Sequence, residues 1–195
     1  MVSNVRDRMV SGAARLLARR GLQATSFSSV LATTNTPRGS IYHHFPGGKD
    51  ELVIAAIAAT EQHALGLLEQ QEGATAEQVA QSFLAAWRAL LLHSDFDAGC
   101  ALVAVTVAAE NDALRARAAD AFHAWQAKLS AALQAGGLAG DDARSAATLL
   151  LAASEGAVVI CRAQRDIRPF DVITGQLMEH VRRLAANPPV QVTCE

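Results

Sequence analysis

The chain has 195 residues, of which 51% are hydrophobic and 18% are charged, so it can bury a substantial core and is not typical of a disordered protein. Aromatic residues and prolines are few, and the abundance of Ala and Leu favours helices over sheet. The net charge of −2 is unevenly divided: residues 1–50 hold seven Lys or Arg against two Asp or Glu, whereas residues 51–195 hold ten against seventeen. We therefore expect only the N-terminal segment to approach a polyanion.

Nothing in the sequence predicts a disulfide framework, a metal site or a membrane segment. Cys100, Cys161 and Cys194 are odd in number, widely separated and without CxxC spacing, which fits a reducing cytoplasm. The N-terminus does not resemble a signal peptide, and the longest apolar run, 146–161, contains polar residues and is too short to span a bilayer. We expect a soluble cytoplasmic protein without a metal or cofactor.

The first 37 residues predict three successive helix starts. Apolar residues at helical spacing predict a helix over about 2–20, which Gly21 would stop. Ser26 is placed to cap a short second helix that ends in the turn-favouring cluster 33–35. Thr36 then offers another N-cap, with Pro37 at the first position of a third helix.

The third helix has an outer face suited to a polyanion. Ile41 and Phe45 are spaced i, i+4 and should face the second helix. The residues left on the outside carry a cation, hydroxyls, a phenol and imidazoles but no carboxylate: Arg38, Gly39, Ser40, Tyr42, His43 and His44. Helix, tight turn and helix is the arrangement that sets a recognition helix into the major groove of DNA. Lys49, which opens the next helix, is a candidate phosphate clamp.

This segment resembles the helix-turn-helix of TetR-family transcriptional repressors. The family's pattern is matched by Ser26, residues 37–40, Tyr42, Phe45 and Lys49, and PRGSIYHHFPGGKDEL is similar to the LmrA/YxaF-like branch. Two departures, Thr-Thr-Asn at 33–35 and His at 43, bear on the operator sequence rather than on DNA binding. The residues predicted to contact DNA are Ser26, Arg38, Gly39, Ser40, Tyr42, His43, His44 and Lys49.

The resemblance implies an all-α fold of about nine helices, with a DNA-binding domain at 1–47 and a ligand-binding and dimerisation body at 48–195. Apolar spacing predicts the body helices over about 48–72, 75–93, 100–109, 111–135, 141–165 and 170–186. Thr75 is the expected cap of the second of these helices, and Asn111 or Asp112 begins the fourth. The segment 100–109 is β-branched enough to suggest a strand, but we interpret it as a helix because it has no partner strand.

The helix at 141–165 is hydrophobic on nearly every side and must therefore be covered all round. Its small residues would let two backbones approach closely. In TetR-like proteins the last two helices form an intersubunit four-helix bundle, which implies a homodimer through about 141–165 and 170–186. Packing within one subunit is the alternative.

Aromatic residues recur in two body helices, and core packing alone would explain them. The resemblance adds a second interpretation, because family members typically bind a small molecule in the body and then release DNA. GCALVAVTVAAE at 99–110 is also similar to the same branch, which implies an apolar or aromatic inducer. The candidate ligand-binding residues are Phe83, Trp87, Val103, Val107, Phe122, Trp125 and Glu155, with His63 and His123 as further polar candidates.

An enzyme is the main alternative class, but the sequence has no HExxH, G-x-S-x-G or Walker A motif. A helical ligand-binding adaptor without sequence-specific DNA binding is a second alternative, which the intact set of Arg38, Tyr42 and Lys49 disfavours. The sequence therefore predicts a ligand-responsive repressor that binds a palindromic operator as a dimer.

Overall fold

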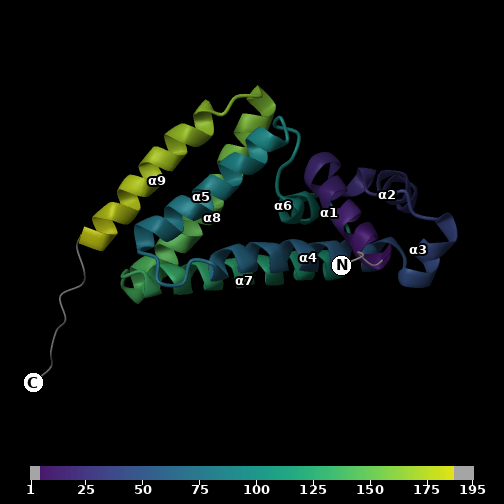
Figure 1. Ribbon diagram of the computed structural model, residues 1–195, viewed down its shortest axis with the longest axis horizontal. Helices are drawn as coiled ribbons and strands as arrows, with labels where there is room; N and C mark the ends of the chain where they lie inside the picture. The colour runs from purple at the N-terminus through teal and green to yellow at the C-terminus, as the bar shows by residue number, and fades with distance from the viewer. Residues whose placement is uncertain (1–4, 187–195) are drawn as a thin grey trace, which may run out of the picture. The chain divides into compact units, whose positions relative to one another are not determined.

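The computed structural model describes residues 5–186, and every regular element in this range is a helix. The predicted all-α fold is confirmed. The helices, drawn in Figure 1, are α1 (Val5–Ala24), α2 (Phe27–Thr34), α3 (Arg38–His44), α4 (Lys49–Glu69), α5 (Ala76–His93), α6 (Ala101–Ala108), α7 (Asp112–Ala135), α8 (Gly140–Gln164) and α9 (Arg168–Ala186). The expected helix start near residue 2, the end of order at 187–189 and Cys194 lie outside the described residues.

The helices group into two compact units. Of the described residues, the first unit comprises 5–64 with 97–124, and the second comprises 65–96 with 125–186. The first unit therefore includes α6 and the first half of α7 as well as the three N-terminal helices. The boundary of a separate DNA-binding domain at 47 stays a prediction.

Helix α1 is the centre of the first unit, where it contacts α2, α3 and α6 (Figure 1). Met9, Ala13 and Leu17 are fully buried along its length. At Gly21 the backbone leaves the helical region (φ 78°, ψ 179°), so the expected helix stop is confirmed even though a last turn continues to Ala24. The segment that leads into α6 is held to α1 by a hydrogen bond from the Gly99 amide to the Ala18 carbonyl (2.8 Å).

Polar contacts tie α4 to α7 within the first unit. Helix α7 begins at Asp112, one of the two predicted starts, and Asn111 caps it, because the Asn111 Oδ1 accepts the amide protons of Ala113 (2.8 Å) and Leu114 (3.2 Å). The Asn111 side chain also donates to Asp50 Oδ2 at 2.6 Å. Further along, Arg117 forms a half-buried ion pair with Glu61.

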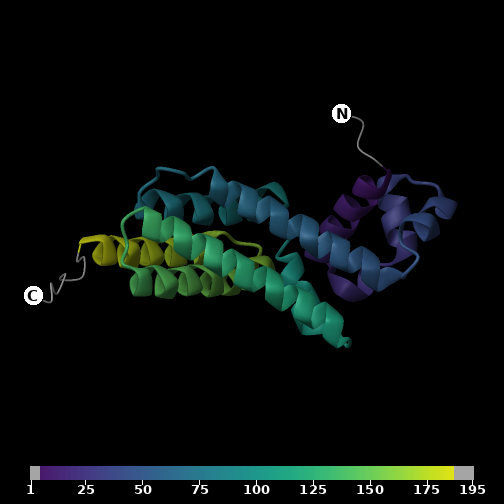
Figure 2. The same cartoon turned by 90° about the horizontal axis from the view of Figure 1, so that it is seen from below.

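The second unit is built on α5, α8 and α9, which pack against one another pairwise (Figure 2). Thr75 caps α5 as expected: its hydroxyl accepts from the Gln78 amide, and the Gln78 side chain accepts from the Thr75 amide. The turn between α7 and α8 docks against this cap, because the Gly136 carbonyl accepts from the Ala76 amide at 2.9 Å.

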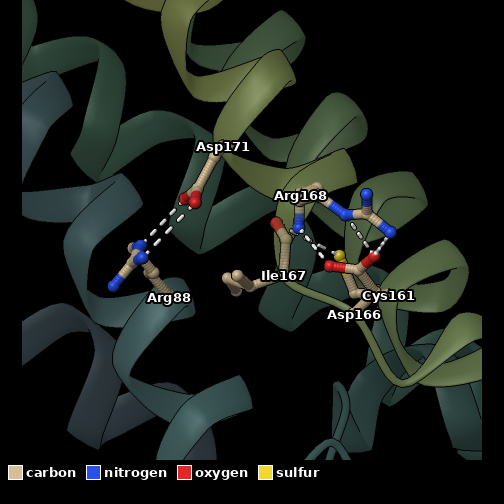
Figure 3. A network of polar contacts seen from close by, with 6 residues as sticks. All are labelled: Arg88, Cys161, Asp166, Ile167, Arg168 and Asp171. Atoms are coloured by element: carbon tan, nitrogen blue, oxygen red, sulfur yellow. Dashed lines mark hydrogen bonds and ion pairs between the residues drawn. The ribbon is translucent and has the colours of Figure 1, made fainter.

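Ion pairs fix the corner where α8 passes into α9 (Figure 3). Arg88 of α5 donates from Nε to Asp171 of α9 at 2.8 Å, and the carboxylate raises the pKa of the guanidinium. In the corner itself, the hydrogen bond from Arg168 holds the pKa of Asp166 below its usual range. The buried Cys161 thiol lies against the Ile167 carbonyl, and burial raises its pKa, so the reactive thiolate is disfavoured.

Helices α4 and α8 are long and apolar enough, by length and composition, to cross a membrane. This differs from the expectation based on 146–161 alone, because α8 extends the apolar run at both ends. The core helices of soluble proteins share this composition. Leu150, Ala157 and Val158 are among several α8 residues that are buried inside the second unit, as expected of a core helix.

Candidate nucleic-acid interface

The start of α2 is fixed by hydrogen bonds among its first residues. Ser26, with an extended backbone, accepts the Ser29 amide proton at 3.2 Å, and the Ser29 hydroxyl oxygen accepts the Ser26 amide proton at 2.8 Å. This capping box satisfies amide groups that have no partner within the helix. At the other end Asn35 adopts the left-handed conformation (φ 50°) and donates its amide proton to Leu31. The predicted cap and the predicted turn are both confirmed.

The start of α3 differs from the prediction by one residue. Pro37 is the N-cap rather than the first helical residue, and it makes no side-chain cap. Thr36 does not cap α3, because its buried hydroxyl is 2.8 Å from the Thr34 hydroxyl, which itself donates to the Val30 carbonyl. The hydroxyl of Thr36 therefore braces the end of α2 instead of the start of α3.

Helix α3 has the two faces that its sequence predicts. Ile41 and Phe45 have no exposed surface, although Phe45 is the C-cap and not a helical residue. On the opposite side Arg38, Gly39, Tyr42 and His43 are exposed, and Ser40 and His44 are half-buried. No acidic residue occurs in α3, so this face attracts rather than repels a polyanion.

Aromatic contacts organise this face. The Tyr42 ring, 66% exposed, meets the Phe27 ring edge to face, with the ring centroids 5.5 Å apart and the planes at 82°. The His43 and His44 rings are 5.2 Å apart. The Arg6 guanidinium lies 5.3 Å from the centre of the buried Phe45 ring, which brings a cation of α1 to the same region.

Lys49 is less exposed than a surface phosphate clamp was expected to be. Its ammonium group donates to the Leu22 carbonyl at 2.8 Å, so it joins the end of α1 to the start of α4. An ammonium group has three donors, and two of them can serve an anion while the third holds this bond. The turn before Lys49 is fixed as well, since the Gly47 amide donates to Glu51 at 2.8 Å.

Sequence reasoning missed Phe27, the Leu22 carbonyl and Glu51 as parts of this region. Phe27 lies three and four residues before Val30 and Leu31, and helical spacing alone gives it no role in DNA binding. The structure leaves it half-buried, with its ring against Tyr42. Of these three, only the contact of Glu51 was predictable from nearby residues. A Glu at the third position of a helix commonly accepts hydrogen bonds from backbone amides just before the helix.

The candidate ligand-binding residues differ in burial. Trp87 and Trp125, both of the second unit, are 9% and 6% exposed. Phe83, Val103, Phe122 and Glu155 are half-buried, whereas Val107 is 78% exposed and lies on the surface of the first unit. His63 and His123 are exposed. The two tryptophans are therefore the best-enclosed of the candidates.

A short capped helix, a tight turn and a second helix with a cationic, carboxylate-free outer face define a helix-turn-helix DNA-binding protein. Residues 10–56 match the model of the bacterial regulatory proteins of the tetR family, and residues 76–176 match that of the C-terminal domain of LmrA/YxaF-like transcriptional regulators. The chain belongs to the TetR family of transcriptional regulators, which are not enzymes.

Curated relatives and solved structures agree with this assignment. The chain is 37% identical to the uncharacterized HTH-type transcriptional regulator Rv0196 of Mycobacterium tuberculosis, over 88% of this chain and 91% of the relative. It is 25% identical to the HTH-type transcriptional regulator LmrA of Bacillus subtilis, over 91% and 97%. Its fold is similar to that of a TetR transcriptional regulator from Legionella pneumophila, with a TM-score of 0.82 at 21% identity, covering 91% of this chain and 97% of that one.

Proposed function

We propose that the protein is a cytoplasmic repressor that binds a palindromic operator as a homodimer and releases it when a small apolar or aromatic molecule binds the body. Operator binding and dimerisation are properties of its family. For this chain we propose which residues contact the operator, which surface forms the dimer and which class of molecule is the inducer.

The outer face of α3 is the observation that carries the proposal. It presents the exposed Arg38 guanidinium and the Tyr42 phenol beside half-buried Ser40, and the helix contains no carboxylate. Arginine and serine can reach base edges in the major groove, while hydroxyl and ammonium groups hold phosphates. Ser26 contributes through the N-terminus of α2, where helix amides favour an anion.

An apolar stripe on α8 supports the proposed dimer interface. Leu149, Val159 and Ile160 are between 42% and 56% exposed, and exposed small residues lie between and beyond them on the same side of the helix: Ala152, Gly156 and Ala163. Exposed apolar side chains in a continuous stripe mark a surface that another protein covers. The same stripe on a second subunit, related by a twofold axis, would cover it. Such a dimer would present two helix-turn-helix segments to the two halves of a palindromic operator.

The inducer is proposed to bind near the buried tryptophans of the second unit. Trp87 and Trp125 offer large apolar surfaces, and half-buried Phe83 and Glu155 add a further ring and a polar group. Apolar pockets with few polar groups typically hold small molecules. For near-complete release the ligand must favour the released state by about 5 kcal/mol.

Selection of bound duplexes from a random DNA pool tests the proposed function. Recovery of a palindrome with two similar half-sites supports both specific recognition and a twofold dimer. No enrichment at low salt would overturn the repressor proposal in favour of the ligand-binding adaptor.

Variants of the proposed DNA contacts should separate base recognition from phosphate contact. Arg38→Ala is expected to cost about 1–3 kcal/mol at particular base positions and to relax the preference there. Lys49→Met, which keeps the length of the stem, should weaken binding equally on all sequences and lower the salt slope by about one. Binding is measured by fluorescence anisotropy against salt concentration, on the selected palindrome and on its single-base variants.

The control for Lys49→Met is thermal unfolding, because the substitution also removes the hydrogen bond to Leu22. Lys128→Met, at an exposed ion pair with Glu69 in the second unit, is the matched variant and should leave the salt slope unchanged. Equal losses on every sequence for Arg38→Ala and Lys49→Met would contradict this division of roles.

A charge in the apolar stripe should dissociate the dimer. Val159→Glu is expected to raise the dissociation constant of the dimer at least about a hundredfold, because a buried carboxylate without a partner costs several kcal/mol. Sedimentation equilibrium measures this change. Val107→Glu, the same substitution at an exposed valine outside the stripe, should leave the oligomeric state unchanged. A dimer of unchanged affinity in Val159→Glu would exclude this face as the interface.

A further inference from the structure

The Tyr42 ring requires contact with another side chain if its orientation is to be fixed. The residue is 66% exposed, whereas the Phe and Trp residues of the described chain are all buried or half-buried. The phenol hydroxyl can contact a phosphate only if the ring points outward at a fixed angle, and each freely rotating side chain loses entropy when it is ordered on binding. Neighbouring Arg38, Gly39 and His43 are themselves exposed.

Phe27 provides that contact from another helix. The two rings meet edge to face at 5.5 Å and 82°, which is the favoured geometry of an aromatic pair. Phe27 is the first residue of α2 and follows Ser26 directly, so the capping box of Ser26 and Ser29 fixes its backbone. A half-buried ring at the start of α2 thus faces an exposed ring on α3.

We propose that Phe27 is a positioning residue for operator binding: through its edge-to-face contact it holds the Tyr42 ring so that the phenol hydroxyl meets the DNA backbone. This inference rests on the proposed function of the α3 face. Phe27 acts through Tyr42 and not through its own contact with a base. It also orders Tyr42 before DNA arrives, which removes part of the entropic cost of binding.

The ring contact can be tested without DNA, because Tyr42 is the single tyrosine of the chain. Fluorotyrosine incorporated into the full-length protein gives one fluorine NMR signal, which reports on this ring alone. Phe27→Leu, which keeps an apolar side chain but removes the ring, should shift and narrow the signal as Tyr42 becomes mobile. Phe27→Trp, which keeps an aromatic face, should retain a broad signal shifted by the neighbouring ring. A signal unchanged by Phe27→Leu would overturn the inference.

The positioning role is tested by a double-mutant cycle with a fluorescein-labelled duplex that carries the selected palindrome. Phe27→Leu should lower the affinity about two- to tenfold, and Phe27→Trp should recover most of that loss. In a Tyr42→Phe background, which lacks the hydroxyl, Phe27→Leu should cause little further loss. Equal losses in both backgrounds, or an altered base preference, would show that Phe27 touches DNA itself and would overturn the proposal.

Two controls keep the outcomes distinct. Thermal unfolding shows whether the Phe27→Leu protein has lost its fold. If it has, Phe27→Met replaces Phe27→Leu in both the NMR and the DNA-binding experiments. If the wild-type protein binds no duplex specifically, the proposed function fails, whereas the NMR arm still tests the ring contact. If the wild type binds and Phe27→Leu binds equally well, only the positioning role fails.

Discussion

Replacing Gly136 with alanine is expected to destabilise the protein by more than about 3 kcal/mol, because the added methyl would meet backbone atoms that cannot move aside. An ideal Cβ at Gly136 would lie 2.4 Å from the Ala76 nitrogen and 2.7 Å from the Thr75 carbonyl carbon. The Gly136 carbonyl also accepts the Ala76 amide proton at 2.9 Å. Relief of the clash would therefore break this hydrogen bond and disturb the Thr75 cap of α5, which is worth about 1 kcal/mol.

Urea unfolding at one fixed protein concentration measures the loss, since the stability of a dimer depends on concentration. Gly66→Ala is the matched control. It lies inside α4 with no atom within 4 Å of the added Cβ, so alanine should stabilise the protein by up to about 1 kcal/mol through helix propensity. A Gly136→Ala protein within about 0.5 kcal/mol of the wild type would show that the turn after α7 can move away from α5.

Helix starts and stops were predictable because they depend on residues a few positions apart. Ser26 and Thr75 each cap a helix through a side chain three residues on, and Gly21 stops α1 with a backbone that glycine adopts at low cost. The β-branched segment 100–109 was correctly interpreted as helical: α6 spans Ala101–Ala108, and the described residues contain no strand to pair with it. Each of these caps and stops depends on residues within about one helical turn of it.

Predictions failed or were incomplete where the deciding partner lies farther away. Thr36 had the composition of an N-cap, but the Thr34 hydroxyl competes for its side chain, and α3 consequently begins without a side-chain cap. The Lys49 ammonium group donates a hydrogen bond to the carbonyl of Leu22, 27 residues earlier, and no sequence pattern predicts that contact. Helical spacing predicts which side of a helix is buried but not which helix covers it.

The candidate DNA-binding residues were predictable from the sequence, whereas the candidate ligand-binding residues were not. The α3 face was predictable because the buried pair Ile41 and Phe45 fixes the rotation of the helix, and every other residue of the helix then follows. The body offered no comparable constraint, because large apolar residues at helical spacing can line a core or a ligand site equally well. Val107, a candidate because it lies between the two aromatic helices in sequence, is 78% exposed.

A close approach of α1 to the end of α2 gives the second large effect. An ideal Cβ at Gly12 of α1 would lie 2.3 Å from the Thr34 methyl carbon, Cγ2, at the end of α2. Thr34 cannot swing away cheaply, because a β-branched side chain is stiff and its hydroxyl donates to the Val30 carbonyl and lies 2.8 Å from the Thr36 hydroxyl. Gly12→Ala is therefore expected to cost about 1–3 kcal/mol of stability and to weaken operator binding by displacing α2 from α1.

Thr34→Ser should rescue Gly12→Ala, because serine keeps the hydroxyl and its hydrogen bonds but lacks the methyl that clashes. In the double variant both the unfolding free energy and the operator affinity should return to within about 0.5 kcal/mol of the Thr34→Ser protein. Thr33→Ser is the matched control, since it removes the same methyl one residue earlier from an exposed threonine whose hydroxyl donates to Ser29. Rescue by both serine variants, or by neither, would mean that contact with the Thr34 methyl is not what requires glycine at position 12.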